Sequence, residues 1–430
     1  MISFPRPAPL YNPITVPPDQ ALTPWEVLAS PFGLILFVAL VPLVRLGARR
    51  WPRASLMVSG IVWVTATAGL LATPILLAGC LLGSAWVVLL GRLLRQGHLG
   101  RHLMLTLVWL GLAAMIAPLW WYPQWNWYGW HGGSRLAVLH NAGVAYFLLR
   151  FISWGVHLSR HPDDALRPLD SLSWILYAPC MRLGPVLLRH EYLERFDAWN
   201  PRAPVPWRQV AQRLGFFLLG GFLLAVITKN LPTVPSTAPH LDFFSSPEHY
   251  STSRLLRVFY FVPIQAYLLL WMYNELACGL ALWVGIRVDD NFDWLPKATS
   301  VRDFWRRWHV TVGNWLRHYI YLPLGTSRRM TLVRHCAVFG FCAVWHGASW
   351  SFVAWGASQV LALSVQHWWD QLRKRLRWRN RPTGKWWTVL CWLLTMHYQI
   401  ATILMFMDFK HCGARVFHEL WLRFASFVSS

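Results

Sequence analysis

The sequence predicts an all-α polytopic membrane protein with about ten transmembrane helices and additional re-entrant elements. Hydrophobic residues make up 55% of the 430 residues and charged residues only 13%, which is about half the charged fraction of a soluble domain. Several segments contain the roughly 20 apolar residues that cross a bilayer core. The formal net charge is +22, but the arginines gather in short loops between apolar segments, as cytoplasmic loops do. We therefore expect a lipid bilayer as partner and no nucleic acid.

The first half of the chain contains these apolar segments: 27–44, 56–90, 103–121 and 136–157. Segment 56–90 is interrupted by Pro74 and has basic residues at both ends, so it is expected to cross twice as a helical hairpin. Residues 1–26 are Pro-rich and lack the basic-then-apolar order of a signal peptide. They are expected to form a lead-in, with the N-terminus outside.

The second half contains these apolar segments: 172–188, 214–231, 255–286, 331–369 and 386–408. Segment 172–188 is short and is broken by Pro179, Gly184 and Pro185, which predicts a re-entrant element covered by neighbouring protein. Segment 331–369 has basic flanks and is expected to enter and return, or to bend near its middle. Residues 409–427 are expected to form an amphipathic tail helix. We find no internal repeat and expect one integral-membrane domain over residues 1–430.

Several common kinds of chemical site have no motif in this chain. The seven cysteines include no CxxC pair, so we expect no disulfide framework and no metal site. The sequence also lacks a GxSxG elbow, a P-loop and HExxH. Without a motif for a nucleophilic Ser or Cys, direct transfer by general-base catalysis is favoured over a covalent enzyme intermediate.

Two histidines in apolar surroundings are the candidate catalytic residues. His346 lies in VWHGASW, between Trp345 and Trp350, and His309 lies in RRWHVTV. A buried imidazole can act as a general base because its pKa is close to neutral and burial favours its neutral form. The alternative for His346 is a packed histidine that hydrogen-bonds a carbonyl group. The alternative for His309 is an ordinary basic segment at the membrane interface, because Arg306 and Arg307 precede it.

Charged residues near these histidines are candidates for substrate binding. Arg306, Arg307 and Arg317 could attract an anionic donor such as a coenzyme A or phosphopantetheine thioester. Lipid phosphates are the alternative partners of such arginines. Glu275 is one of few acids in the apolar regions, so it needs an Arg or His partner or must be protonated.

Three stretches resemble, in this order, the membrane-bound O-acyltransferase family: NELACGLALWVGIRVDDNF, FWRRWHVTVGNWLRHYIYLPLG and VWHGASWSFVAWG. The sequences of these stretches most resemble the branch of alginate O-acetyltransferase and teichoic-acid D-alanyl transfer. The earlier stretch YAPCMRLGPVLLRHEYL is similar to the family segment that ends in Gly-Pro-Ile and a basic residue. The resemblance covers the core at 172–410 well and the first 170 residues only by pattern.

The resemblance implies a ring of helices around a central tunnel, with His346 as general base and His309 as a second polar residue. It also implies transfer of an acyl group, acetyl or another short acyl, from a cytoplasmic thioester to a hydroxyl of a cell-surface polysaccharide, lipid or related acceptor. The donor would be acyl-CoA or an acyl-carrier-protein thioester, with no bound cofactor. The expected location is the inner or plasma membrane, with a possible outer-face or periplasmic partner enzyme. The full set of expected substrate-binding residues is Arg182, Glu275, Trp305, Arg306, Arg307, Trp308, Asn314, Arg317, Trp345 and Trp350.

Three features leave the branch and its acceptor open. The stretch ILYAPCMRLGPV, with Arg182 before Gly184 and Pro185, also resembles the glycerol-uptake and hedgehog acyltransferase branch. His318 stands in WLRHY where the branch usually has WLRDY, and Glu275 stands where the branch has Asp. Long-chain transfer to a lipid or protein acceptor therefore stays an alternative. A transporter or flippase with the same polar core is another alternative, although it predicts inverted repeats. A third is an inactive scaffold that recruits a partner acyltransferase.

Overall fold

The computed structural model describes residues 31–68, 72–121, 144–166, 168–181, 184–231, 243–325, 327–346, 350–376, 384–408 and 413–429. The described residues form α-helices, short 3₁₀ and π turns and connecting loops, without a strand. They divide into two compact units. The first contains Leu22–Phe222 and Leu270–Asp290, and the second contains Leu223–Leu269 and Asn291–Ser430. The prediction of an all-α fold is confirmed.

Four helices in the described part of the chain are long and apolar enough to cross a membrane. These spans are Leu77–Arg95, Trp207–Asn230, Thr252–Val284 and Lys385–Met407. They fit a polytopic membrane protein, as the composition predicted. The count of about ten crossings and the ring around a tunnel stay predictions.

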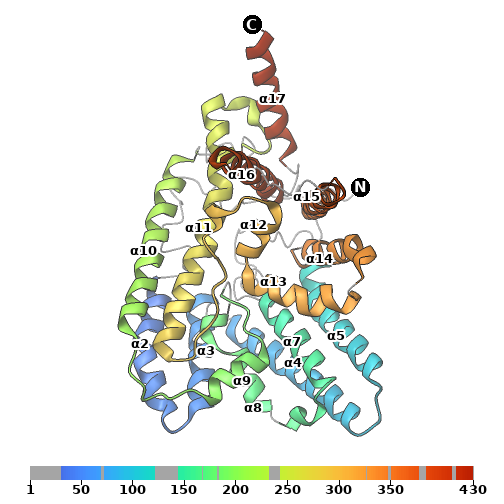
Figure 1. Ribbon diagram of the computed structural model, residues 1–430. Coiled ribbons are helices and arrows are strands. Elements are labelled where there is room, and N and C mark those ends of the chain that lie inside the picture. The colour runs from blue at the N-terminus through green and yellow to red at the C-terminus, as the bar shows by residue number, and fades with distance from the viewer. Residues whose placement is uncertain are drawn as a thin grey trace, which may run out of the picture. The chain divides into compact units, whose positions relative to one another are not determined.

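The helices of the first unit appear in blue to green in Figure 1. They are α2 (Pro31–Ala48), α3 (Pro52–Ala68), α4 (Ala72–Arg95), α5 (Arg101–Trp121), α7 (Val144–Leu158), α8 (Pro168–Ile175) and α9 (Arg189–Asp197). Segment 56–90 folds as parts of α3 and α4, which contact each other. This agrees with the predicted helical hairpin.

The broken segment 172–188 lies inside this first unit. After α8 it forms one 3₁₀ turn at Ala178–Cys180, and its described residues from 184 to 188 are buried and lie outside any helix. Arg150 of α7, only 1% exposed, donates hydrogen bonds to the carbonyl oxygens of Ile175, at 2.5 Å, and of Cys180. Because buried carbonyl groups need partners, this arginine makes the irregular backbone tolerable in apolar surroundings. The expectation that protein covers this backbone is thus confirmed.

Helices α10 (Trp207–Asn230) and α11 (Thr252–Val284) each have residues in both units. Within the first unit, a Cβ on Gly220 of α10 would meet the side chain of Met272 of α11 at 3.2 Å. With 33 residues, α11 is about 50 Å long at 1.5 Å per residue. It therefore exceeds a bilayer core of roughly 30 Å and must tilt or project from it.

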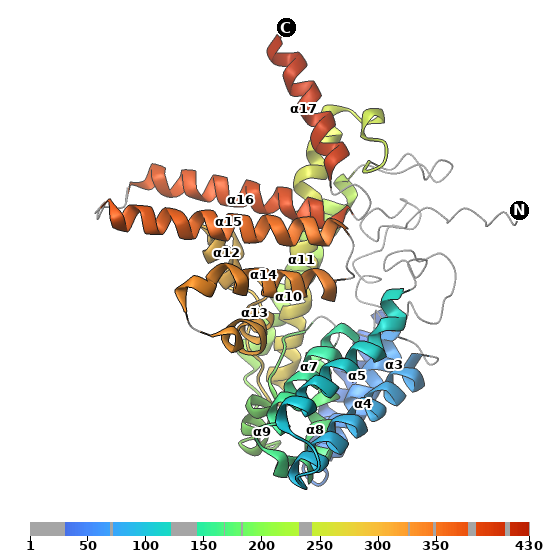
Figure 2. The same cartoon turned by 90° about the vertical axis from the view of Figure 1, so that its right-hand side faces the viewer.

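The second unit contains the remaining helices. They are α12 (Val301–Arg307), α13 (Val310–Leu316), α14 (Thr331–Trp345), α15 (Trp350–Arg375), α16 (Lys385–Met407) and α17 (Ala414–Ser429). Figure 2 shows α15 and α16 side by side, and the two helices contact each other. Helix α14 ends at Trp345 and packs against α15, which begins at Trp350. The predicted bend within 331–369 is confirmed.

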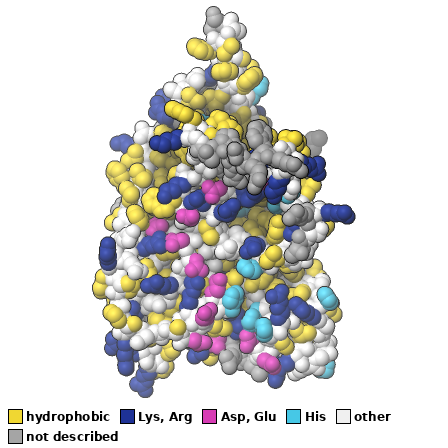
Figure 3. All heavy atoms as spheres, viewed as in Figure 1, with side chains coloured by type: hydrophobic (Ala, Val, Ile, Leu, Met, Phe, Trp, Pro, Cys, Tyr) yellow, Lys and Arg dark blue, Asp and Glu magenta, His cyan; other side chains and the backbone are white. Residues whose placement is uncertain are grey.

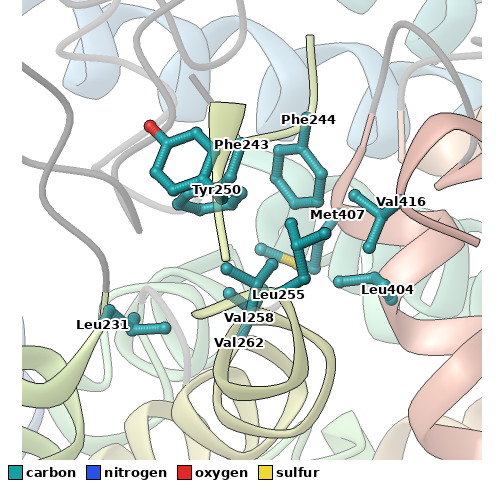
Figure 4. Packing of buried hydrophobic residues seen from close by; sticks show 10 residues of the cluster. All are labelled: Leu231, Phe243, Phe244, Tyr250, Leu255, Val258, Val262, Leu404, Met407 and Val416. Carbon is teal, nitrogen blue, oxygen red and sulfur yellow. The ribbon is translucent and has the colours of Figure 1, made fainter. Parts of the chain in front are cut away.

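The tail helix α17 is anchored by apolar packing of its first half and by Arg423, which donates a hydrogen bond to the hydroxyl of Thr252 at 3.2 Å. Val416 belongs to a buried apolar cluster that joins the start of α11 to the end of α16 (Figure 4). Hydrophobic side chains lie on the surface of α17 in Figure 3, and its exposed apolar residues are Trp421, Leu422, Phe424, Phe427 and Val428. At 3.6 residues per turn, Trp421, Phe424, Phe427 and Val428 lie on one face of the helix, and Leu422 lies to one side of it.

Gly60 of α3 and Gly79 of α4 make a matched pair of tests for this packing. A Cβ on Gly60 would lie 1.9 Å from the carbonyl oxygen of Leu176, whereas a Cβ on Gly79 would meet nothing within 4 Å. We expect Gly60→Ala to lower stability by about 1–3 kcal/mol or more, because the backbone of the broken segment cannot yield easily. Gly79→Ala should be neutral or stabilise by up to about 1 kcal/mol. Thermal unfolding of the two purified variants in detergent checks this, and equal melting temperatures would contradict it.

Candidate active site

The arginine-rich stretch 304–325 is a broken helix with a left-handed residue at His309. Helix α12 is capped by Ser300, whose hydroxyl accepts a hydrogen bond from the Asp303 backbone N–H at 3.1 Å. Trp308 is extended, and His309 has φ 46° and ψ 50° before α13 begins. The carbonyl group of His309 then accepts a hydrogen bond from Gly313 N–H at 2.7 Å. His309 therefore lies at the junction between α12 and α13, where the helix is interrupted.

The ring of His309 is enclosed by aromatic side chains. Its centroid lies 5.2 Å from the ring of Phe292 and 5.5 Å from that of Trp308. The Nδ1 atom is buried and has no hydrogen-bond partner among the described residues. His309 lies outside the four membrane-spanning helices, and burial lowers its pKa from 6.5 to about 4. The imidazole is thus neutral at neutral pH, with one nitrogen able to accept and the other able to donate a hydrogen bond.

His346 lies where α14 stops, and its backbone N–H donates to the carbonyl group of Cys342 at 2.9 Å. Its ring contacts aromatic rings from three helices: Trp345 at 4.8 Å, Phe352 at 5.7 Å, Trp355 at 6.2 Å and Phe406 at 4.8 Å between centroids. These contacts hold the imidazole at the end of a helix, in apolar surroundings and partly accessible.

A layer of aromatic rings connects the two histidines within the second unit. From His346 the successive contacts run through Trp355, Trp305, Phe304 and Trp308 to His309, with centroid distances of 6.2, 5.9, 5.6, 5.7 and 5.5 Å. Trp305 is fixed in this layer because its indole N–H donates to the side-chain oxygen of Gln359 at 3.0 Å. The amide of Gln359 donates in turn to Thr402 at 2.9 Å. The four aromatic candidates from the sequence belong to this unit, and Trp305, Trp308 and Trp345 contact this layer or its histidines. Trp350 also lies in this unit, at the start of α15.

The arginine candidates of the same stretch differ in their surroundings. Arg307 forms ion pairs with Asp293 at 3.0 Å and with Asp303 at 3.1 Å. Arg306 and Arg317 are exposed. The charge of Arg307 is therefore largely neutralised by carboxylates of the protein, whereas the side chains of Arg306 and Arg317 are exposed. Substrate binding by any of the three stays a prediction.

The remaining candidates are more scattered. Trp350 is 84% exposed, and Asn314 is exposed, with its carbonyl group 2.8 Å from Nδ1 of His318. Glu275 belongs to the first unit and is buried, and its carboxylate accepts a hydrogen bond from Arg213 at 2.9 Å. This is the pairing that an acid in an apolar region requires. Arg182 lies outside the described residues.

Sequence reasoning missed Asn291, Phe292, Gln359 and Phe406. The first two end the stretch NELACGLALWVGIRVDDNF, which was noticed only for its resemblance. Gln359 is a polar residue in the apolar helix α15 and is fully buried. A buried amide needs hydrogen-bond partners, so this residue type was the available signal.

Comparison with known proteins gives consistent matches. The model of the membrane-bound O-acyltransferase family matches residues 62–407. A peptidoglycan O-acetyltransferase of Helicobacter pylori is 30% identical over 234 residues, which cover 54% of this chain and 42% of that protein. A probable alginate O-acetylase of Azotobacter vinelandii is 28% identical, over 53% of this chain and 45% of that protein. A teichoic acid D-alanyltransferase of Bacillus subtilis is 22% identical, over 60% of this chain and 66% of that protein. The chain thus spans less than half the length of the first two relatives.

The buried imidazole of His309 predicts a pH dependence of stability. The unfolded chain binds its proton near pH 6.5, whereas the folded protein resists protonation down to about pH 4. Between these values the unfolded state holds more protons, so stability is lost as the pH falls below 6.5. We expect His309→Gln to remove up to about 2 kcal/mol of the destabilisation that wild type suffers between pH 7 and pH 5.

Melting temperatures of wild type and His309→Gln at both pH values check this expectation. The other histidines are common to both proteins and cancel in the comparison. Identical losses on acidification in the two proteins would show that His309 is not held neutral by burial.

Proposed function

Because the chain belongs to the membrane-bound O-acyltransferase family, we propose that it transfers an acyl group from a thioester donor to a hydroxyl group of a cell-surface acceptor. The acyl group is acetyl or another short one and the acceptor is a polysaccharide. Relatives named for O-acetylation of peptidoglycan and alginate support this choice. The protein lies in the cell membrane with its N-terminus outside, and the donor reaches it from the cytoplasm.

The observation that carries this proposal is the pair of histidines at the two ends of one aromatic layer. His309 and His346 come from separate helical segments and lie in motifs, RRWH and WHGASW, that resemble the family. Aromatic rings around both imidazoles make their surroundings apolar, which limits the access of water that would otherwise compete with the acceptor hydroxyl for the thioester.

In the proposed reaction His346 acts as general base. Its neutral imidazole takes the proton of the acceptor hydroxyl while that oxygen attacks the thioester carbonyl carbon. The tetrahedral intermediate collapses by breaking the carbon–sulfur bond, and the thiolate leaves and receives the proton from the imidazolium. An ester and a free thiol result, so atoms and charges balance.

His309 stabilises the oxygen on which negative charge develops. A neutral imidazole can donate one N–H to that oxygen, and a donor in place before the reaction needs no reorganisation. The same ring could orient the acceptor hydroxyl through its other nitrogen. Either role requires a ring with a fixed direction.

Arg306 and Arg317 attract the donor. Both acyl-CoA and an acylated carrier protein carry phosphate groups near the thioester arm, and exposed guanidinium groups bind phosphate well. Arg307, which is already paired with two carboxylates, contributes to the position of the segment and less to donor attraction.

Replacement of the proposed base is the first test. We expect His346→Ala to lower the transfer rate by roughly 10²–10⁴-fold, because proton removal by a positioned base contributes that much. The assay follows thiol release and labelled acetyl transfer by purified protein in proteoliposomes, with acetyl-CoA and with an acetylated carrier protein as donors. His346→Gln is the matched control for side-chain volume and should be equally slow. Transfer at the wild-type rate by folded His346→Ala would refute the assignment.

Replacement of the exposed arginines tests donor attraction. We expect Arg306→Ala and Arg317→Ala to raise the KM for the donor with little change in kcat, since they act before the chemical step. The effect should shrink at high salt, where exposed charges are screened. Arg208→Ala, at an exposed position of α10, is the control. Donor KM values equal to those of the control at low salt would exclude this role.

A further inference from the structure

Two residues other than glycine have a left-handed backbone in the described part of the chain, and both lie near the proposed site. They are Trp294, with φ 41°, and His309, with φ 46°. This conformation costs an L-residue roughly 1–2 kcal/mol. It persists only where the surroundings impose it, and such positions cluster at functional sites. The relevant surroundings are the segments 291–294 and 307–311, which pair with each other.

Hydrogen bonds connect the two segments on the N-terminal side of His309. The backbone N–H of Asp293 donates to the carbonyl group of Arg307 at 3.1 Å. The guanidinium of Arg307 donates back to the carbonyl group and to the carboxylate of Asp293, both at 3.0 Å. The end of α12 is thereby tied to Asp293 through both backbone and side chain.

Asn291 makes the connection on the C-terminal side of His309. Its carbonyl group accepts a hydrogen bond from Val310 N–H at 2.9 Å. Its side-chain oxygen accepts two more, from the N–H of Thr311 at 3.2 Å and from the hydroxyl of Thr311 at 2.6 Å. Asn291 is fully buried and Thr311 nearly so. These bonds satisfy backbone N–H groups in the first turn of α13, which have no partner within their own helix.

Phe292 lies between these two connections in the chain and contacts the histidine directly. Its ring is 5.2 Å from the ring of His309 and 5.4 Å from that of Trp308. The bonds of Asn291 and Asp293 hold the backbone on either side of His309, and Phe292 limits the direction of its ring.

We propose that Asn291, Phe292 and Asp293 form a positioning clasp for His309, and that Asn291 acts through Thr311. The clasp holds the His309 backbone in its left-handed conformation and the imidazole against Phe292 and Trp308. This inference rests on the proposed function for the role of His309, but the clasp itself is a property of the fold. Arg307 is part of the clasp through Asp293 and is a positioning residue.

Thr311→Val and Thr311→Ser are the variants that test the clasp. Valine has nearly the shape of threonine but cannot donate to Asn291, whereas serine keeps the hydroxyl. We expect Thr311→Val to lower kcat by about 10-fold or more with KM nearly unchanged, because a small misplacement of a reacting group is costly. Thr311→Ser should restore most of the rate.

A double-mutant cycle separates positioning from a general structural role. If Thr311 acts through His309, Thr311→Val should change kcat by less than about 2-fold in a His309→Ala background. The same 10-fold loss in both backgrounds would overturn the proposal, and so would an unchanged kcat in Thr311→Val alone.

Reactivity of His309 gives a readout that does not need acyl transfer. Diethyl pyrocarbonate acylates neutral imidazole nitrogens, and peptide mass spectrometry gives the rate for each histidine. We expect Thr311→Val to raise the rate at His309 several-fold, Thr311→Ser to leave it unchanged, and the exposed His98 to react equally in all proteins. A raised His309 rate in a protein that transfers no acyl group would support the clasp and refute the proposed function. An unchanged His309 rate in Thr311→Val would refute the clasp, whatever the activity.

Asp293→Ala supports the same test should Thr311→Val fail to fold. The side chain of Asp293 is 66% exposed, so its removal deletes the ion pair with Arg307 and leaves the backbone bonds between the two residues, without opening a cavity. As for Thr311→Val, we expect a lower kcat and a higher reactivity of His309. Wild-type values for both would contradict the proposal.

Discussion

The turn at His309 is the feature on which the proposed site depends. A continuous helix through 301–316 would carry His309 among its neighbours on a helical surface. Instead, one left-handed residue separates α12 from α13 and brings the imidazole against Phe292 and Trp308. The chain tolerates this backbone because Asn291 and Asp293 bond the residues on either side of it. Strain at one residue is thus offset by several hydrogen bonds from a segment close to it in space.

The same physical rule explains the arginines of this basic chain. Polar groups in apolar surroundings need partners within the protein. Arg150 provides donors to the carbonyl groups of the broken segment, and Arg213 joins Glu275 to Asp290 at 2.9 and 2.7 Å. Arg307 likewise forms ion pairs with two carboxylates. From the net charge alone these arginines would be expected to bind lipids or substrates. Their contacts show that they bind groups within the protein.

Much of the architecture could be predicted from sequence because it follows from local patterns. The length of the apolar segments predicted α10, α11 and α16. The basic residues at both ends of segment 56–90, together with Pro74 within it, indicated the α3–α4 hairpin. The basic residues at both ends of segment 331–369 indicated the break between α14 and α15. The contacts of the candidate site could not be predicted, because they join residues distant in sequence. Neither the bond from Thr311 to Asn291 nor the aromatic layer from Trp355 to Trp308 has a periodic signature. The left-handed backbone of His309 also has none, since the expected residue there is glycine.

In the proposed reaction, His309 and His346 act on one thioester. The most direct measurement is an experimental structure with a non-transferable thioether analogue of acetyl-CoA bound. We expect the carbonyl oxygen of the analogue to lie within hydrogen-bond distance, about 2.6–3.2 Å, of a nitrogen of His309, with the ring of His346 facing the same carbonyl carbon. An analogue bound away from the aromatic layer, with both rings turned toward lipid, would contradict it.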